Sequence, residues 1–100
     1  MDYGKIPPQA IDMEKAVLGT VIFESNQIID IIDLLKPESF YQPENGIIWN
    51  TLVDLYSKSQ PIDVLSVQEN LRKNGKLESV GGVFYISELT NMATFGIVHH

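Results

Sequence analysis

Cysteine is absent from this chain. Its absence excludes disulfide frameworks, thiolate metal sites and thiol nucleophiles, and fits a reducing compartment. No run approaches the roughly 20 consecutive apolar residues that a membrane helix requires, and the first residues lack the basic-then-apolar pattern of a signal peptide. We therefore expect a soluble, cytoplasmic protein that makes no membrane contact and is held together by hydrophobic packing.

Basic residues are scarce. Seven lysines and arginines stand against 13 aspartates and glutamates, which gives a net charge of −6. A surface of this sign gains no affinity by releasing counterions from nucleic-acid phosphates. The one small basic group, Arg72 with Lys73 and Lys76, is explained by a favourable interaction with the negative end of a helix. We expect no direct DNA binding by this chain.

Apolar residues, by contrast, make up 44% of the 100 positions. A chain of this size buries roughly 60–70% of its unfolded surface when it folds as one domain. There is no internal repeat, low-complexity tract or linker-like change of composition. We therefore predict a single ordered domain over residues 1–100.

Helical spacing of the apolar residues predicts two helices in the first third of the chain. The first runs from about residue 12 to 23, after Pro7-Pro8. The second runs through residues 28–35, with Ser25 or Asn26 as its cap and Lys36-Pro37 as its end. The isoleucine-rich composition of this second segment weakly favours a strand instead. The i, i+4, i+7 spacing favours the helix.

Three further helices follow by the same criteria. Pro43 suits the first turn of a helix that reaches about residue 58. Asp63 is placed to cap a helix that Asn74-Gly75 ends, with Glu69 and Lys73 spaced for an ion pair. A fifth helix covers residues 83–91, after Gly81-Gly82, and residues 92–100 are predicted to be the stub of a following helix. The predicted fold is all-α, a compact bundle of about five or six short helices.

Catalytic, cofactor and metal sites have no sequence signal here. The chain lacks the G-x-x-x-x-G-K-[ST] phosphate loop, so Gly81-Gly82 are interpreted as a local turn. No serine lies in a nucleophile-elbow pattern, and no alternating set of oxygen ligands surrounds a turning glycine. His99-His100 face different directions if helical, which argues against a zinc site. We predict no catalytic, cofactor-binding or metal-binding residue, and hence no enzyme activity in this chain.

Protein contacts are the remaining role for the unusual side chains. The aromatic residues fall at helical spacing or at helix entries, which favours packing in a core or an interface over base stacking. Phe95, Ile97 and Val98 near the end of the chain have no predicted partner and are the candidate interface residues. Glu14 shares the apolar side of the first helix with Val17. We therefore predict that its carboxylate has a partner, with free backbone N–H groups of the helix's own first turn as first candidates and a basic side chain as second.

A series of short motifs extends in a fixed order over about residues 7–91. It comprises Pro7-Pro8, Glu14, Ala16, Val17, Leu18, Gly19, Phe40-Tyr41, Ile48, Leu52, Leu55, Pro61-Ile62-Asp63, Glu69, Leu71, Gly75, Leu77, Val80-Gly81-Gly82, Tyr85 and Leu89. Each motif alone is weakly specific, but their order and spacing together are specific. In this series the chain resembles the N-terminal domain of DnaB-type replicative DNA helicases. It departs from that family at Asn45, where histidine is common, so no role of that histidine is carried over.

The resemblance implies a helical head domain in the N-terminal collar of a hexameric, ATP-driven 5′-to-3′ helicase. It also implies the partners of such a domain: other helicase subunits, primase and, in some members, a helicase loader. ATP and magnesium would act in the motor domain, whose motifs do not occur in this chain. The alternative is a stand-alone helical adaptor, such as the similarly folded helicase-binding domain of primase, which would not share the ordered motifs.

Overall fold

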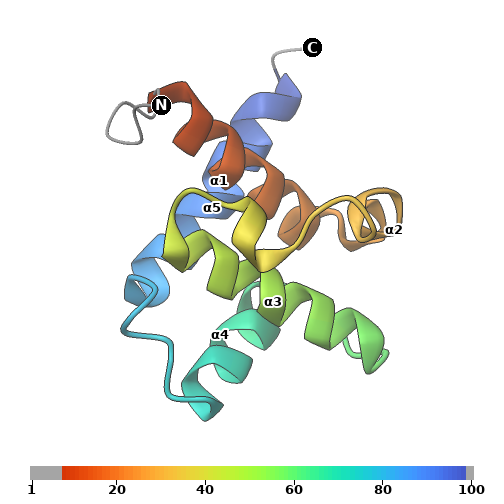
Figure 1. Ribbon diagram of the computed structural model, residues 1–100, viewed down its shortest axis with the longest axis vertical. Coiled ribbons are helices and arrows are strands. Elements are labelled where there is room, and N and C mark those ends of the chain that lie inside the picture. The colour runs from red at the N-terminus through yellow and green to blue at the C-terminus, as the bar shows by residue number, and fades with distance from the viewer. Residues whose placement is uncertain (1–7, 99–100) are drawn as a thin grey trace.

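A computed structural model describes the backbone of residues 8–98 and the side chains of residues 10–92 (Figure 1). The elements in chain order are α1 (Pro8–Phe23), η1 (Ser25–Gln27), α2 (Ile28–Ile31), η2 (Pro37–Ser39), α3 (Pro43–Ser57), α4 (Val64–Lys73) and α5 (Gly82–Val98). Within residues 8–98 there is no β-strand, and the predicted all-α fold is confirmed. In the same range no helix is long and apolar enough to cross a bilayer.

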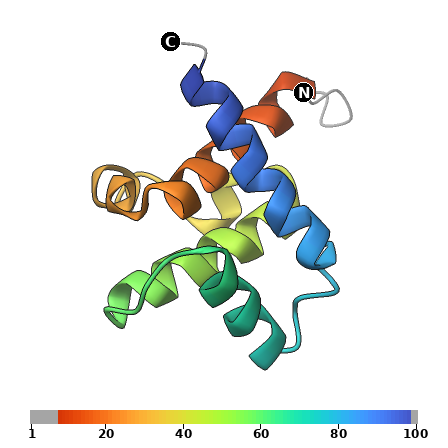
Figure 2. The same cartoon turned by 180° about the vertical axis from the view of Figure 1, so that it is seen from behind.

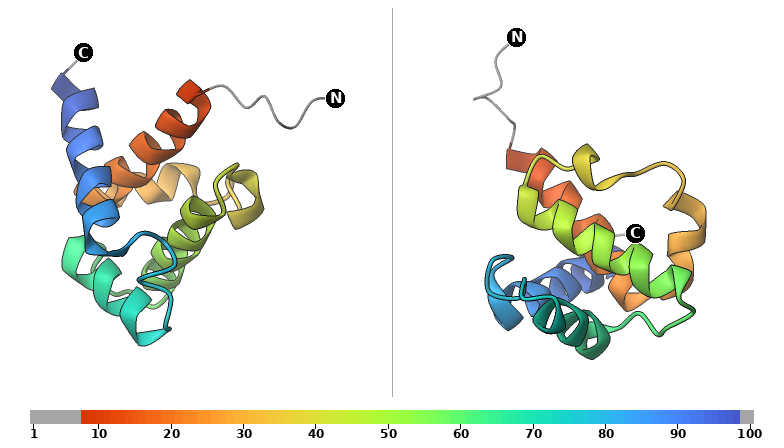
Figure 3. Two further views of the ribbon diagram at one scale, coloured as in Figure 1. Left: turned by 90° about the vertical axis from the view of Figure 1, so that its left-hand side faces the viewer. Right: turned by 60° about the horizontal axis from the view of Figure 1, so that its bottom comes forward.

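The helix pair α1 and α5 forms the most extensive contact in the fold. Figure 2 shows α5 lying across α1, and the left view of Figure 3 shows the two helices diverging toward the N-terminal end of α1 and the C-terminal end of α5. Helix α3 packs against both α1 and α4, and α4 packs against α5. The helices therefore enclose one core, to which α1, α3, α4 and α5 each contribute one face.

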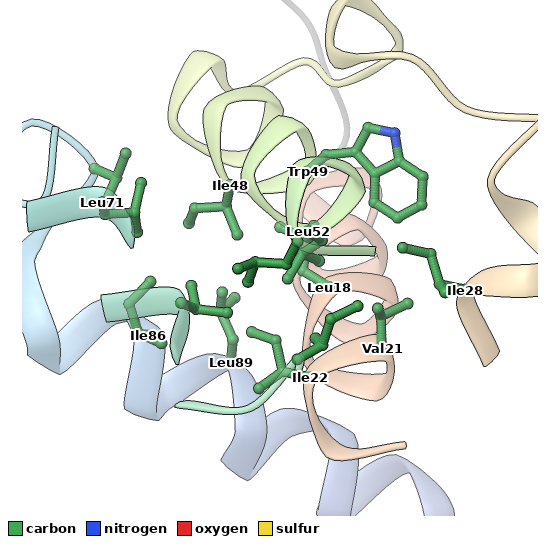
Figure 4. Packing of buried hydrophobic residues seen from close by; sticks show 14 of the residues in the cluster. Leu18, Val21, Ile22, Ile28, Ile48, Trp49, Leu52, Leu71, Ile86 and Leu89 are labelled. Atoms are coloured by element: carbon green, nitrogen blue, oxygen red, sulfur yellow. The ribbon is translucent and has the colours of Figure 1, made fainter. Parts of the chain in front are cut away.

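The core is a single cluster of buried apolar side chains (Figure 4). Its fully buried members include Leu18, Val21, Ile28, Ile48, Trp49, Leu52, Val67, Leu71, Ile86 and Leu89. The indole N–H of Trp49 donates to the carbonyl of Leu35 at 3.1 Å, so this buried ring leaves no polar group unpaired. The apolar stripes predicted from helical spacing on the third and fourth helices face this cluster.

The third and fourth helices agree closely with their predicted bounds. Pro43 occupies the first turn of α3, and the Asp63 carboxylate caps α4 by accepting from the Ser66 N–H at 2.8 Å. Gly75 has a φ of +71°, the left-handed conformation that ends a helix without steric cost. Glu69, however, pairs with Arg72 at 2.5 Å, three residues on, and the predicted pair with Lys73 is wrong.

The second helix is much shorter than predicted. Only Ile28–Ile31 is α-helical, preceded by the 3₁₀ turn of η1 and followed by a turn. No side chain caps either element, so neither Ser25 nor Asn26 has the predicted capping role. Four isoleucines in five positions also lower helix propensity, because branching at Cβ restricts their rotamers. Burial of Ile28 in the core anchors this short segment.

The last helix is longer than predicted. α5 continues without interruption to Val98, so the expected end near Asn91 is wrong, and residues 92–98 are part of α5 and not the stub of a following helix. No proline follows Asn91, and Met92 and Ala93 are good helix formers. The side chains of Phe95, Ile97 and Val98 lie outside the described side chains. His99-His100 lie outside the described residues.

Candidate functional site

The Glu14 carboxylate is the centre of a polar junction between α1 and the start of α3. It accepts hydrogen bonds from the backbone N–H of Tyr41 at 2.5 Å and of Gln42 at 3.3 Å. A third bond comes from the side-chain amide of Asn45 at 2.9 Å. Gln42 is the N-cap residue of α3 and makes no side-chain capping bond of its own. A carboxylate supplied by another helix therefore lies at the positive end of α3, where negative charge is stabilised.

The prediction that Glu14 has a partner is confirmed, but the predicted identity of that partner is wrong. Because α1 begins at Pro8, Glu14 lies beyond the first turn, where the backbone N–H groups are free. Its three donors belong instead to the segment that enters α3, 27 to 31 residues further along the chain. No basic side chain of the described residues pairs with it.

Asn45 extends the junction to a third helix. Its side chain is fully buried, with 0% exposure, and uses both ends of its amide. The nitrogen donates to Glu14, and the oxygen accepts from the hydroxyl of Tyr85 on α5. A buried polar group is tolerated only when it is hydrogen-bonded, and no buried side-chain nitrogen or oxygen of the described residues lacks a partner. Glu14, Asn45 and Tyr85 together join α1, α3 and α5, and we call them the polar junction.

The Tyr85 hydroxyl acts as a donor over a wide pH range. Burial raises the pKa of Tyr85 from 10.0 to about 12, and the nearby charge of Glu88 adds to the effect. Lys15 covers the ring face at 5.5 Å from its centroid and pairs with Glu88 at 3.3 Å. The hydroxyl therefore stays protonated near neutral pH. A phenol with so high a pKa and a carboxylate already holding three donors are suited to fixing helices in place and are poorly suited to proton transfer.

The described residues also carry two surface depressions. A polar one of about 610 Å³ lies between α3 and α4, lined by side chains that include Asn50, Asp54 and Asn70. An apolar one of about 310 Å³ lies on α1 beside η1 and α2. No group of three histidine, cysteine, aspartate or glutamate residues suited to a metal ion occurs among the described residues. The features of this surface are therefore those of contact with other molecules.

Several large apolar side chains are exposed where the sequence offered no warning. Met13 on α1 is 67% exposed, Leu65 on α4 is 72% exposed and Phe84 on α5 is 88% exposed. Trp49, by contrast, is in the core as its helical spacing predicted. The predicted interface residues Phe95, Ile97 and Val98 stay a prediction. A helical-wheel signal for Met13 existed, because it begins a stripe with Val17 and Thr20 beside the core-facing stripe.

Comparison with known proteins points in one direction. The model of the family described as DnaB-like helicase N-terminal domain matches residues 6–98. The replicative DNA helicase DnaB of Rhodothermus marinus is 40% identical over 87 residues, which are 87% of this chain and 9% of that protein. The DnaB of Geobacillus stearothermophilus is 34% identical over 87 residues, again 87% of this chain, and 19% of that protein. The chain thus spans 9–19% of the length of these curated relatives.

Solved structures give the same result. The crystal structure of the N-terminal domain of DnaB helicase from Mycobacterium tuberculosis matches with a TM-score of 0.81 at 31% identity, over 87% of this chain and 60% of that one. The N-terminal domain of DnaB helicase from Helicobacter pylori, described with its interactions with primase, matches with a TM-score of 0.62 over 91% of this chain and 87% of that one. At 21% identity the second comparison establishes the shared fold alone.

Proposed function

This chain belongs to the family of DnaB-like helicase N-terminal domains, and from that premise we propose that it is the protein-interaction and oligomerisation domain of a replicative DNA helicase. In this role it supports the collar of a hexamer and docks primase during DNA replication. The observation that carries the proposal is the match of residues 6–98 to the family model, because it covers almost the whole chain.

The chemistry of the described surface supports a role in protein contacts. The polar junction holds α1, α3 and α5 together through hydrogen bonds to Glu14 and Asn45, which fixes the faces that these helices present to solvent. Partners that recognise packed helices need such fixed faces. The H. pylori relative supports primase as one partner, since its N-terminal domain was described together with its interactions with primase.

The enzymatic work belongs to a motor domain in this proposal. The whole helicase would unwind duplex DNA using ATP and magnesium, and both would bind outside this chain, which carries no phosphate-binding loop. Other helicase subunits are partners of the collar, and a helicase loader is a further partner in some members of the family. The chain alone should therefore show no ATP turnover above a buffer control, and at most weak self-association in sedimentation.

Two other functions are separated by direct observation. For a stand-alone adaptor, the natural coding sequence downstream of His100 would lack a Walker A motif, whereas our proposal requires one there. For a small DNA-binding domain, a gel shift would appear at moderate salt. The net charge of −6 predicts no such shift, and a shift that weakens steeply with added salt would contradict our proposal.

A further inference from the structure

An apolar groove of about 310 Å³ lies between α1 and the segment formed by η1 and α2. Its lining includes Met13, Ala16, Val17, Thr20, Gln27 and Ile31, and none of these side chains carries a charge. Met13 is 67% exposed at the edge of the groove, although burying a side chain of this kind is favourable by roughly 1.5–3 kcal/mol. An uncovered groove with a flexible methionine at its edge is typical of a surface that receives another apolar group.

The length of the groove matches one face of an α-helix. The lining residues of α1 extend from Met13 to Thr20, seven residues apart. At a rise of about 1.5 Å per residue this distance is about 10 Å. A helix lying along the groove would place side chains at positions i, i+3 or i+4, and i+7 over the same distance. The groove can therefore hold three successive apolar anchors of one helix.

The charges around the groove have one sign. Asp12 is adjacent in sequence to Met13, Asp30 is adjacent to Ile31, and Glu24 lies one helical turn beyond Thr20, and all three carboxylates are exposed. Between residues 10 and 35 the only cation is Lys15. Its ammonium group pairs with Glu88 at 3.3 Å and lies over the ring of Tyr85, on the side of α1 that faces α5. The border of the groove is therefore negative and uncompensated within this segment.

We propose that this groove is a docking site for an amphipathic helix of a partner protein, with large aliphatic anchors on one face and lysine or arginine along the borders of that face. Opposite charge across an interface steers association and excludes wrong partners. A second copy of this chain has a net charge of −6 and would bring like charge to the same border, so the occupant is a basic partner. This proposal does not depend on primase as the partner in the preceding section.

The test uses a synthetic helical peptide of about 14 residues, four turns, with leucine at the anchor positions and lysine on the flanks. A matched peptide carries glutamate in place of lysine. Titration of the ¹⁵N-labelled chain followed by NMR should give shift changes at Met13, Thr20 and Ile31 with the lysine peptide, and at least about tenfold weaker binding of the glutamate peptide. Equal binding of both peptides, or binding of neither, overturns the proposal.

Two charge-matched variants locate the contact. Met13→Lys adds a positive charge at the groove, and Leu65→Lys adds the same charge on α4, at a side chain that is 72% exposed. We expect Met13→Lys to raise the Kd for the lysine peptide about tenfold, and Leu65→Lys to leave it within about twofold of the unmodified chain. Equal effects of the two variants would show attraction by net charge alone and refute the docking site. Loss of a dimer in Met13→Lys, seen by sedimentation, would refute it as well, because it would identify a second copy as the occupant.

Discussion

Replacing Glu14 by alanine perturbs the polar junction at its centre. The change removes the acceptor of three N–H groups, which belong to Tyr41, Gln42 and Asn45. The Asn45 amide is fully buried, and leaving such a donor unpaired costs about 1–3 kcal/mol. Tyr41 and Gln42 are exposed residues, so water can satisfy their backbone N–H groups in part and the added cost is smaller. We expect a total loss of about 1–3 kcal/mol in the free energy of unfolding.

Urea unfolding measures this loss directly. Trp49 is the only tryptophan and is fully buried, so its fluorescence reports loss of the core. The midpoint should fall while the slope with urea stays constant, because the same surface becomes exposed on unfolding. For a domain of this size the loss corresponds to a fall of roughly 5–20 °C in Tm.

Glu24→Ala is the matched control for this change. It removes the same charge from the end of α1, where Glu24 is exposed and its side chain makes no capping bond. A change at such a site usually stays within about 0.5 kcal/mol. If Glu14→Ala lost no more stability than Glu24→Ala, or gained stability, the hydrogen bonds to Glu14 would not hold α3 in place and our reasoning would be refuted.

Three further predictions concern the core, a cap and the pH dependence of stability. Leu71→Ala should lower the free energy of unfolding by about 2–5 kcal/mol in urea unfolding, because Leu71 is fully buried and leaves a cavity; a loss under about 1 kcal/mol would show that the residue is not a core position. Asp63→Ala should cost about 1 kcal/mol and reduce helicity near the start of α4, since Ser66 loses its 2.8 Å capping acceptor; unchanged stability would contradict this role. Burial raises the pKa of Tyr85 from 10.0 to about 12, so the unfolded chain loses its proton first; the stability linked to this group is present below pH 10 and is lost as the pH rises from 10 to 12. Tyr85→Phe should remove that part of the alkaline loss, and an identical stability–pH curve for both proteins would contradict the burial of this hydroxyl.

Local signals account for the elements that sequence predicted well. Helix α4 has a capping carboxylate at Asp63, apolar residues at helical spacing and Gly75 at its end, and all of these act within a few residues. The isoleucine-rich segment after residue 27 follows helical spacing too, yet only Ile28–Ile31 is helical. Its neighbours supply no cap, and contact with the core through Ile28 decides its shape. Spacing alone therefore overestimated the second helix.

The polar junction was predictable only in part. The position of Glu14 on the apolar side of α1 was enough to predict a partner for its carboxylate. The donors themselves come from residues 27 to 31 positions away, and only the packing of α3 against α1 brings them close. The pairing of Asn45 with Tyr85 spans 40 residues and has no local signature. Long-range contacts of this kind depend on the whole fold.

Binding to primase tests the central claim most directly. The chain would be titrated, by isothermal calorimetry, with primase from the same organism, and in parallel with the same primase lacking its helicase-binding domain. Our account predicts saturable binding to the complete primase with a Kd in the range of about 1–10 μM, and no binding to the shortened protein. Absence of binding to the complete primase at about 100 μM, with the chain shown to be folded by Trp49 fluorescence, would contradict the account.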